Sequence, residues 1–121
     1  MSKYLYRIVD QTDWEIAQRE GVVPRCGADD RDGFVHLSTE NDYLETANRY
    51  FVPAERPLAL VVDEAALGGT LRWEVVTSRG GVRFPHLYAA GIPLQSVRGI
   101  IRLDHGDNGF VAQAMIPFCA R

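Results

Sequence analysis

The stretch Asp32-Gly33-Phe34-Val35-His36-Leu37-Ser38-Thr39 decides the fold that we predict from the sequence. Val35 and Leu37 are apolar and face one way in an extended chain, while the residues that alternate with them face the other way. This alternation predicts a strand over residues 33–38. It places His36 in mid-strand, on the face that meets solvent or lines a cleft.

A helix is expected directly after this strand, with Thr39 as its N-cap and apolar residues at helical spacing up to Pro53. The free backbone donors and the dipole at a helix N-terminus favour an anion. His36, Ser38 and Thr39 could therefore cradle a phosphate or a ribose. The alternative is that His36 is a half-buried polar residue and that Ser38 and Thr39 only cap the helix.

A second stretch, Phe84-Pro85-His86-Leu87-Tyr88, repeats the pattern Phe-x-His-Leu, and it holds another of the three histidines of the chain. Phe84, His86 and Tyr88 share one face of the expected strand. Two histidines in matching surroundings could supply a general acid and a general base, or hold the sugar of a nucleotide. Chance repetition of a short pattern is the competing interpretation.

Arg72 and Glu74 lie between these stretches and share one face of an expected strand, with Trp73 on the other face. A carboxylate beside an arginine can orient a sugar hydroxyl, although a surface ion pair explains the same residues. Arg72 and Arg83 both lie next to the histidine strands, where their planar guanidinium groups could meet a pyrophosphate.

The rest of the chain predicts helices early and strands late. A capping box at Thr12 and Glu15 opens a short helix that Gly21 ends. Residues 22–32 read as a long polar loop, residues 64–69 as a helical turn, and residues 110–118 as either strand or helix. Further strands are expected over residues 3–9, 57–63, 71–76, 83–88 and 97–103. We therefore predict an α+β fold, with a split, mostly antiparallel sheet and two short helices.

With 121 residues, 46% of them hydrophobic, the chain is expected to form a single domain over residues 1–121. Lys3 is the single lysine against twelve arginines, so no lysine is placed for Schiff-base or phosphate-loop chemistry. The net charge of −3 argues against broad binding to nucleic acid and favours a small anionic, nucleotide-like ligand.

Cys26 and Cys119 lie far apart and outside any C-x-x-C pair, so we expect reduced thiols. No leader and no membrane-spanning run is visible, which predicts a cytoplasmic protein. The spacing of the histidines and acids is not that of a metal site, so no metal is expected. His105, in a polar turn, is expected to play no part.

Taken together, these ordered motifs resemble the small bacterial proteins of the domain of unknown function 952 family. The resemblance implies a fold similar to that of the ADP-ribosyltransferases, within the clade of RNA 2′-phosphotransferases that keeps two histidines. The acidic chain shows no basic wing domain, which argues against an RNA substrate.

The resemblance also implies roles for the motif residues. His36 would contact the ribose of NAD beside the nicotinamide, His86 would be the second histidine, and Tyr88 would lie near it. With Phe34 and Ser38, these residues would floor a cleft for NAD or a related ADP-ribosyl compound, and Glu74 is the candidate general base. A sensor that binds the same ligand without catalysis, and an interaction module without a ligand, are the alternatives.

Overall fold

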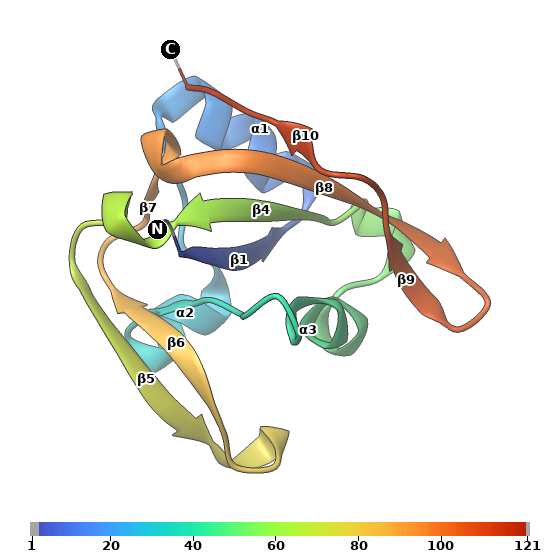
Figure 1. Cartoon of the computed structure of the whole chain (residues 1–121), viewed down its shortest axis with the longest axis horizontal. Helices are drawn as coiled ribbons and strands as arrows, with labels where there is room; N and C mark the ends of the chain where they lie inside the picture. Colours follow the sequence, from blue (N-terminus) through green and yellow to red (C-terminus); the bar gives the residue numbers. More distant parts are fainter. Residues whose placement is uncertain (1–2, 121) are drawn as a thin grey trace.

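Two antiparallel sheets form the frame of the protein in the computed structural model, which describes residues 3–120 (Figure 1). The larger sheet has the order β1-β4-β8-β10, and β9 pairs with β8 at one end. The smaller sheet has the order β3-β6-β5, and β2 and β7 form a separate ribbon. The strands are β1 (Tyr4–Val9), β2 (Val22–Val23), β3 (Val35–His36), β4 (Leu58–Asp63), β5 (Thr70–Val76), β6 (Val82–Tyr88), β7 (Ile92–Pro93), β8 (Val97–Gly106), β9 (Gly109–Ala112) and β10 (Ile116–Pro117).

The segment around His36 joins the two sheets. Val35 and His36 pair with Leu87 and His86 of β6 in the smaller sheet. Two residues later, the backbone of Ser38 exchanges two hydrogen bonds of 2.8 Å with Tyr6 of β1 in the larger sheet. One extended segment therefore belongs to both sheets, which is the split that the sequence predicted.

The described residues form three α-helices: α1 (Gln11–Glu20), α2 (Gly27–Asp32) and α3 (Tyr43–Tyr50). Trp14 and Ala17 of α1 are buried in one core cluster, together with alternate residues of β1 and β4. Tyr43 and Ala47 of α3 are buried in a second cluster, together with residues of β1 and β4 that point to the other face of the sheet, such as Ile8, Ala59 and Val61. Helices therefore cover both faces of the larger sheet, as the period of two along each strand requires.

The predicted α+β class and the mostly antiparallel sheet are confirmed, but the count of two helices is wrong. The missed helix is α2, which lies inside the expected loop of residues 22–32 together with β2. Its six residues are too few to show a helical period, and its acidic run looks like a solvated loop. Asp29 nevertheless faces inward and is fully buried.

Two helix starts also differ from the prediction. Helix α1 begins after Asp10, whose carboxylate accepts the Asp13 N–H at 2.7 Å, so Thr12 is not its N-cap. Helix α3 begins after Asp42, and Thr39 lies before it. Thr39 contributes its carbonyl, which accepts from the N–H groups of Asp42 and Tyr43.

The late strands and the turn at residues 64–69 lie where the sequence predicts them, and the turn contains η2 (Glu64–Ala66). The ambiguous C-terminal segment contains β9 and β10. Further 3-10 turns are η1 (Pro53–Glu55), η3 (Thr77–Arg79) and η4 (Leu94–Ser96).

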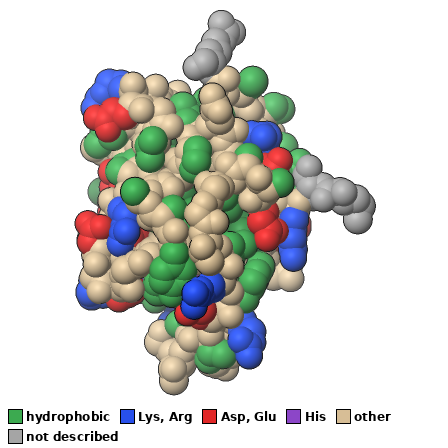
Figure 2. Space-filling view, turned by 90° about the vertical axis from the view of Figure 1, so that its left-hand side faces the viewer, with side chains coloured by type: hydrophobic (Ala, Val, Ile, Leu, Met, Phe, Trp, Pro, Cys, Tyr) green, Lys and Arg blue, Asp and Glu red, His purple; other side chains and the backbone are tan. Residues whose placement is uncertain are grey.

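The surface mixes apolar and charged side chains on the side that Figure 2 shows, where acidic and basic groups separate small groups of hydrophobic ones. Over residues 3–120, no helix is long and apolar enough to cross a membrane. Cys26 and Cys119 are both free thiols.

Candidate functional site

His36 and His86 lie directly opposite each other on neighbouring antiparallel strands, β3 and β6. Their ring centroids are 5.7 Å apart. Phe34 packs between them: its ring stacks on His86 with centroids 3.9 Å apart, and its centroid is 4.6 Å from that of His36. We call His36, His86, Phe34, Glu74 and Tyr88 the two-histidine site.

Local sequence explains this placement. Gly33 ends α2 in the left-handed region, with φ of 85°, and its N–H reaches the carbonyl of Asp29. A glycine adopts this conformation without the steric cost of a Cβ, so the helix can turn at once into β3. Val35 and Leu37 then face the core, and the period of two turns His36 to the opposite face.

Asp29 lies directly beneath His36 and holds it. Its Oδ1 is 2.7 Å from His36 Nδ1 and accepts the His36 backbone N–H at 3.1 Å. Arg7 of β1 donates to both oxygens of the same carboxylate, at 3.2 and 2.6 Å. Arg7 and Asp29 are only 5% and 0% exposed, so they form a buried, two-pronged ion pair.

The second ring nitrogen of His36 also faces a carboxylate, because Nε2 is 2.9 Å from Oδ2 of Asp32. Ionised carboxylates only accept hydrogen bonds, so each of them can take a hydrogen bond from a ring N–H of His36. Asp29 is the buried partner of the ring and Asp32 is its partner on the solvent side.

Both carboxyl groups are held in the ionised form. Burial by itself raises the pKa of Asp29, but hydrogen bonds from His36 and Arg7 outweigh it and hold this pKa well below its usual range. Hydrogen bonds from Arg31 and then from His36 lower the pKa of Asp32. The site therefore keeps two carboxylates around one histidine at neutral pH.

His86 has a different environment, with one nitrogen held and one open. Its Nδ1 is 2.9 Å from Oε1 of Glu74 on β5, and the Tyr88 hydroxyl donates to the same oxygen at 2.6 Å. Nε2 of His86 has no hydrogen-bond partner among residues 3–120. A histidine with Nδ1 on a carboxylate and a free Nε2 can accept a proton at Nε2.

Glu74 and Tyr88 shift each other's pKa through the hydrogen bond that joins them. The hydrogen bond from Tyr88, followed by that from His86, lowers the pKa of Glu74. The same bond to Glu74 raises the pKa of Tyr88, because ionising the phenol would place two negative charges together. Glu74 is therefore better suited to orient His86 and stabilise positive charge than to accept a proton itself.

Arg72 joins this group from β5. It lies opposite His86 in the strand register, and its guanidinium carbon is 5.4 Å from the centroid of the Tyr88 ring. It forms no ion pair with Glu74 in the part of the chain that the structure describes. Trp73 faces the other way and packs against the core, as the sequence predicts.

Three residues predicted to bind the ligand lie elsewhere. Ser38 is buried, and its hydroxyl shares a 3.0 Å hydrogen bond with Thr46 of α3, because the chain has already left β6 for β1. The Thr39 hydroxyl donates to Asp42 at 2.9 Å. Arg83 lies on the opposite face of β6 from His86, since its number is odd, and it reaches the Trp73 carbonyl at 3.4 Å.

Sequence reasoning missed Arg7, Asp29 and Asp32, which fix the position of His36. Asp29 and Asp32 lie in the segment expected to be a loop. Arg7 lies on the expected strand of residues 3–9, and nothing in the pattern of that strand marks Arg7 as a partner of a distant residue. The sequence holds one signal for this helix, which is an Asp three residues after Cys26. At the start of a helix, an acidic side chain in this position can accept a hydrogen bond from the backbone N–H of the residue before the helix. Asp29 does so, accepting the Cys26 N–H at 2.9 Å.

Arg79, at the tip of the β5–β6 hairpin, was also missed. Its side chain is 6% exposed and lies over Phe84, 4.5 Å from the ring centroid. It donates to the Thr46 hydroxyl at 3.1 Å and lies 3.3 Å from a Glu45 carboxylate oxygen, both on α3. The hairpin that carries Glu74 and His86 is therefore anchored to a helix at its far end.

No cluster of three or more His, Cys, Asp or Glu side chains in residues 3–120 is arranged to hold a metal ion. The polar groups that the site offers are instead imidazoles, carboxylates, one phenol and one guanidinium. Such groups suit the hydroxyls, the charge and the planar ring of a small organic ligand.

The fold and the site define an α+β protein with two antiparallel sheets and two carboxylate-bound histidines where the sheets meet. The chain belongs to the family described as Protein of unknown function (DUF952), whose model matches residues 8–100. This confirms the family resemblance found in the sequence. The similarity to ADP-ribosyltransferases stays a prediction.

Solved structures of one relative share this fold. The chain is similar to the crystal structure of protein CC0527 from Caulobacter crescentus, with 34% identity and a TM-score of 0.78 over 92% of this chain and 94% of that one. It is also similar to the solution NMR structure of CC0527, with 34% identity and a TM-score of 0.72 over 88% of this chain and 90% of that one. No curated protein matches the chain.

Proposed function

We propose that the two-histidine site binds NAD or a related ADP-ribosyl nucleotide and that the protein is an enzyme of the ADP-ribosyltransferase type. The observation that carries the proposal is the direct pairing of His36 and His86 on one sheet face, each with Nδ1 on a carboxylate. Two imidazoles fixed in this way can grip a ribose and move a proton.

The two histidines have separate roles in this proposal. His36 stays on buried Asp29 through Nδ1, and a ribose hydroxyl replaces the more exposed Asp32 at Nε2. His86 offers Nε2 as the general base, with its ring oriented by Glu74. Arg72, whose guanidinium lies over the Tyr88 ring, meets the anionic part of the nucleotide.

The proposed reaction breaks the bond between nicotinamide and C1′ of the ribose. Nicotinamide leaves with the electron pair of that bond, and the positive charge that develops on the ribose is stabilised by the Glu74 carboxylate. An acceptor O–H or N–H group then bonds to C1′ and gives its proton to Nε2 of His86. Nicotinamide, the ADP-ribosylated acceptor and one proton are the products.

The test is a thermal-shift titration with NAD, ADP-ribose and AMP, combined with an assay for released nicotinamide. A ligand that binds only the folded state adds about 2.7 kcal/mol of stability at a hundredfold excess over its Kd. We expect NAD and ADP-ribose to raise the Tm of the wild type, and we expect His36→Gln and His86→Gln to remove the shift. His105→Gln, which changes a histidine outside this site, is the control.

A non-catalytic sensor is the second candidate, and the burial of His86 favours it. His86 is only 5% exposed because Phe34 covers one face of its ring, which restricts the approach of an acceptor. A Tm shift with NAD and no nicotinamide release would assign the site to a sensor. If the wild type shows no shift with any of the three nucleotides, the nucleotide proposal is wrong.

A further inference from the structure

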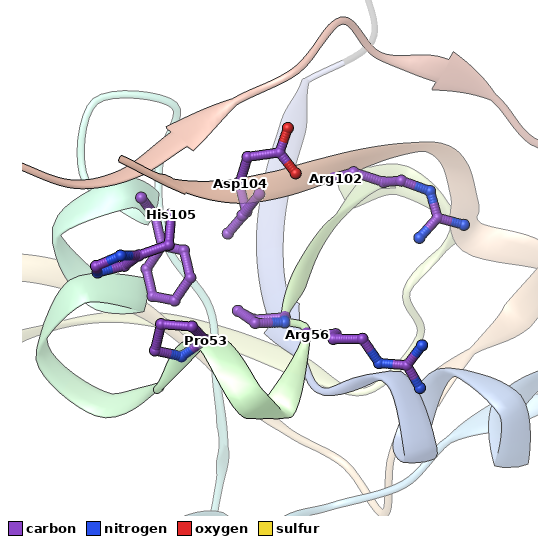
Figure 3. Close-up of a pocket in the computed structure, with 8 residues that line it drawn as sticks. Pro53, Arg56, Arg102, Asp104 and His105 are labelled. Carbon is purple, nitrogen blue, oxygen red and sulfur yellow. The ribbon is translucent and has the colours of Figure 1, made fainter. Parts of the chain in front are cut away.

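A second candidate site lies where η1 meets β8 and β9 (Figure 3). It is a cavity of about 250 Å³, and none of its lining residues belongs to the two-histidine site. Its apolar part is formed by Pro53, Pro57, Leu103 and Phe110. We call it the arginine cavity, after Arg56 and Arg102, which line its polar side.

Arg56 has an unusual backbone conformation. Its φ is 48°, and it is the one residue other than glycine with positive φ in residues 3–120. A side chain in the left-handed region costs free energy that glycine would avoid, and such residues concentrate at functional sites. The conformation ends η1, and the Arg56 side chain lines the cavity together with Arg102, as Figure 3 shows.

Both guanidinium groups are available to a ligand. Several other arginines of the chain pair with carboxylates, as Arg7 does with Asp29 and Arg49 with Glu45. Arg56 and Arg102, by contrast, form no ion pair and no side-chain hydrogen bond within the described chain. In Figure 3 the two side chains come from different elements and extend to the same side of the cavity.

The remaining charged groups leave this cavity positive. Asp104 is its one lining carboxylate, and it pairs with neither arginine among the described residues. His105 contacts Phe110 edge to face, with ring centroids 5.2 Å apart. Two arginines against one aspartate give a local charge of about +1, in a protein whose net charge is −3.

We propose that the arginine cavity binds a small organic oxyanion, in which one carboxylate or phosphate group is attached to an apolar body. The forked donors of Arg56 and Arg102 match the oxygens of either group in two-pronged geometry. The apolar body packs on the prolines and on Phe110. The cavity volume is slightly below the usual range for drug-sized ligands, which points to a small metabolite.

The test uses benzoate and phenyl phosphate as probes, with benzamide as the neutral analogue of the same shape. Binding is followed by two-dimensional NMR on the full chain. Both oxyanions should shift the amide signals of Arg102 and Phe110, and the tighter of the two identifies the preferred group. Benzamide should bind at least about tenfold more weakly, because a charge-assisted hydrogen bond contributes at least one decade in Kd.

The variants are chosen so that folding is preserved. Arg56→Gly keeps the positive φ without strain, and Arg102→Gln changes an exposed side chain. Each should weaken oxyanion binding by about tenfold. Arg98→Gln, on the same strand but outside the cavity, is the matched control and should bind as the wild type does. Equal affinity in all four proteins, or no shift at Arg102 and Phe110 with either probe, would overturn the proposal.

Discussion

One buried carboxylate, that of Asp29, determines the geometry of His36. It accepts from the His36 ring, the His36 backbone, the Arg7 guanidinium and the Cys26 backbone. A carboxylate removed from water is stable only when its oxygens are fully engaged, and here they are. Asp29 therefore links strand β1, helix α2 and strand β3 at one point.

Replacing this group should be costly. Asp29→Asn removes the negative charge and leaves Arg7 buried without a counter-ion. We expect the free energy of unfolding at pH 7 to fall by about 3–5 kcal/mol, as in other broken buried ion pairs. Urea unfolding of variant and wild type measures this loss. Asp32→Asn, which changes the solvent-side partner of the same histidine, should leave the stability close to that of the wild type.

The same carboxylate predicts a pH dependence. The pKa of Asp29 is lowered in the folded state, so its contribution is complete above the unfolded pKa of about 4 and is lost as pH falls through the folded pKa. The difference in the free energy of unfolding between the wild type and Asp29→Asn should therefore become smaller as the pH falls from 5 to 3. Urea midpoints measured at each pH would show this. A difference that stays constant over this range would contradict the assignment.

The Glu74–Tyr88 hydrogen bond gives a second prediction for single residues. The pKa of Tyr88 is raised because its phenol donates to the Glu74 carboxylate. Glu74→Gln removes the negative charge, so the pKa of Tyr88 should move down toward the ordinary value for tyrosine. An NMR titration with labelled tyrosine measures it. Glu20→Gln, at the end of helix α1, is the control, and an equal shift in both variants would argue against the contact.

At the scale of elements, the β5–β6 hairpin carries Glu74, His86 and Tyr88 but extends away from the rest of the molecule (Figure 1). It pairs with the frame along one side only, through the two residues of β3. Arg79 anchors its tip to helix α3. The precision of the site therefore depends on a contact at the far end of the hairpin.

Loss of that contact should loosen the hairpin. Arg79→Gln removes the hydrogen bond to Thr46 and the packing on Phe84, and we expect about 1–3 kcal/mol less stability. Amide hydrogen exchange in β5 and β6 should become faster than in the wild type, while exchange in β4 stays slow. Arg83→Gln is the matched control, because Arg83 is exposed on the same hairpin. Equal exchange in both variants would show that the tip does not anchor the hairpin.

The sequence predicts an element well when the apolar residues of that element are also its buried residues. Strand β4 is a continuous apolar run and is buried from Leu58 to Val62. Helix α2 was missed because its inward side chain is Asp29, which an apolar period cannot reveal. The prediction of Thr39 as an N-cap was wrong because a turn separates Thr39 from α3. In this turn the Thr39 carbonyl accepts hydrogen bonds from the N–H groups of Asp42 and Tyr43.

The site was predictable to the extent that it follows strand alternation. His36, His86, Phe34, Glu74 and Tyr88 all lie on one face because the strands pair in direct register. The partners Asp29 and Arg7 were not predictable, since 22 residues separate them in the sequence. An ion pair between residues so far apart in the sequence produces no local sequence pattern from which it could be predicted.

At the scale of the whole molecule, one core cluster connects the two sheets. It includes Leu5 and Leu60 of the larger sheet and Val35 and Leu87 of the smaller one, with Trp14 of α1. Trp73, on the hairpin, packs against the same cluster. Because the hairpin and the frame share this core, we expect the chain to unfold as one cooperative unit.

The two tryptophans allow this to be tested from both ends of the core. Trp14→Phe leaves Trp73 as the reporter of the hairpin, and Trp73→Phe leaves Trp14 as the reporter of α1. In each variant the urea midpoint from tryptophan fluorescence should coincide with that from circular dichroism, with a slope of about 1–3 kcal/mol/M. An earlier fluorescence midpoint for Trp73 alone would show that the hairpin, and with it half of the two-histidine site, opens independently of the sheet beneath it.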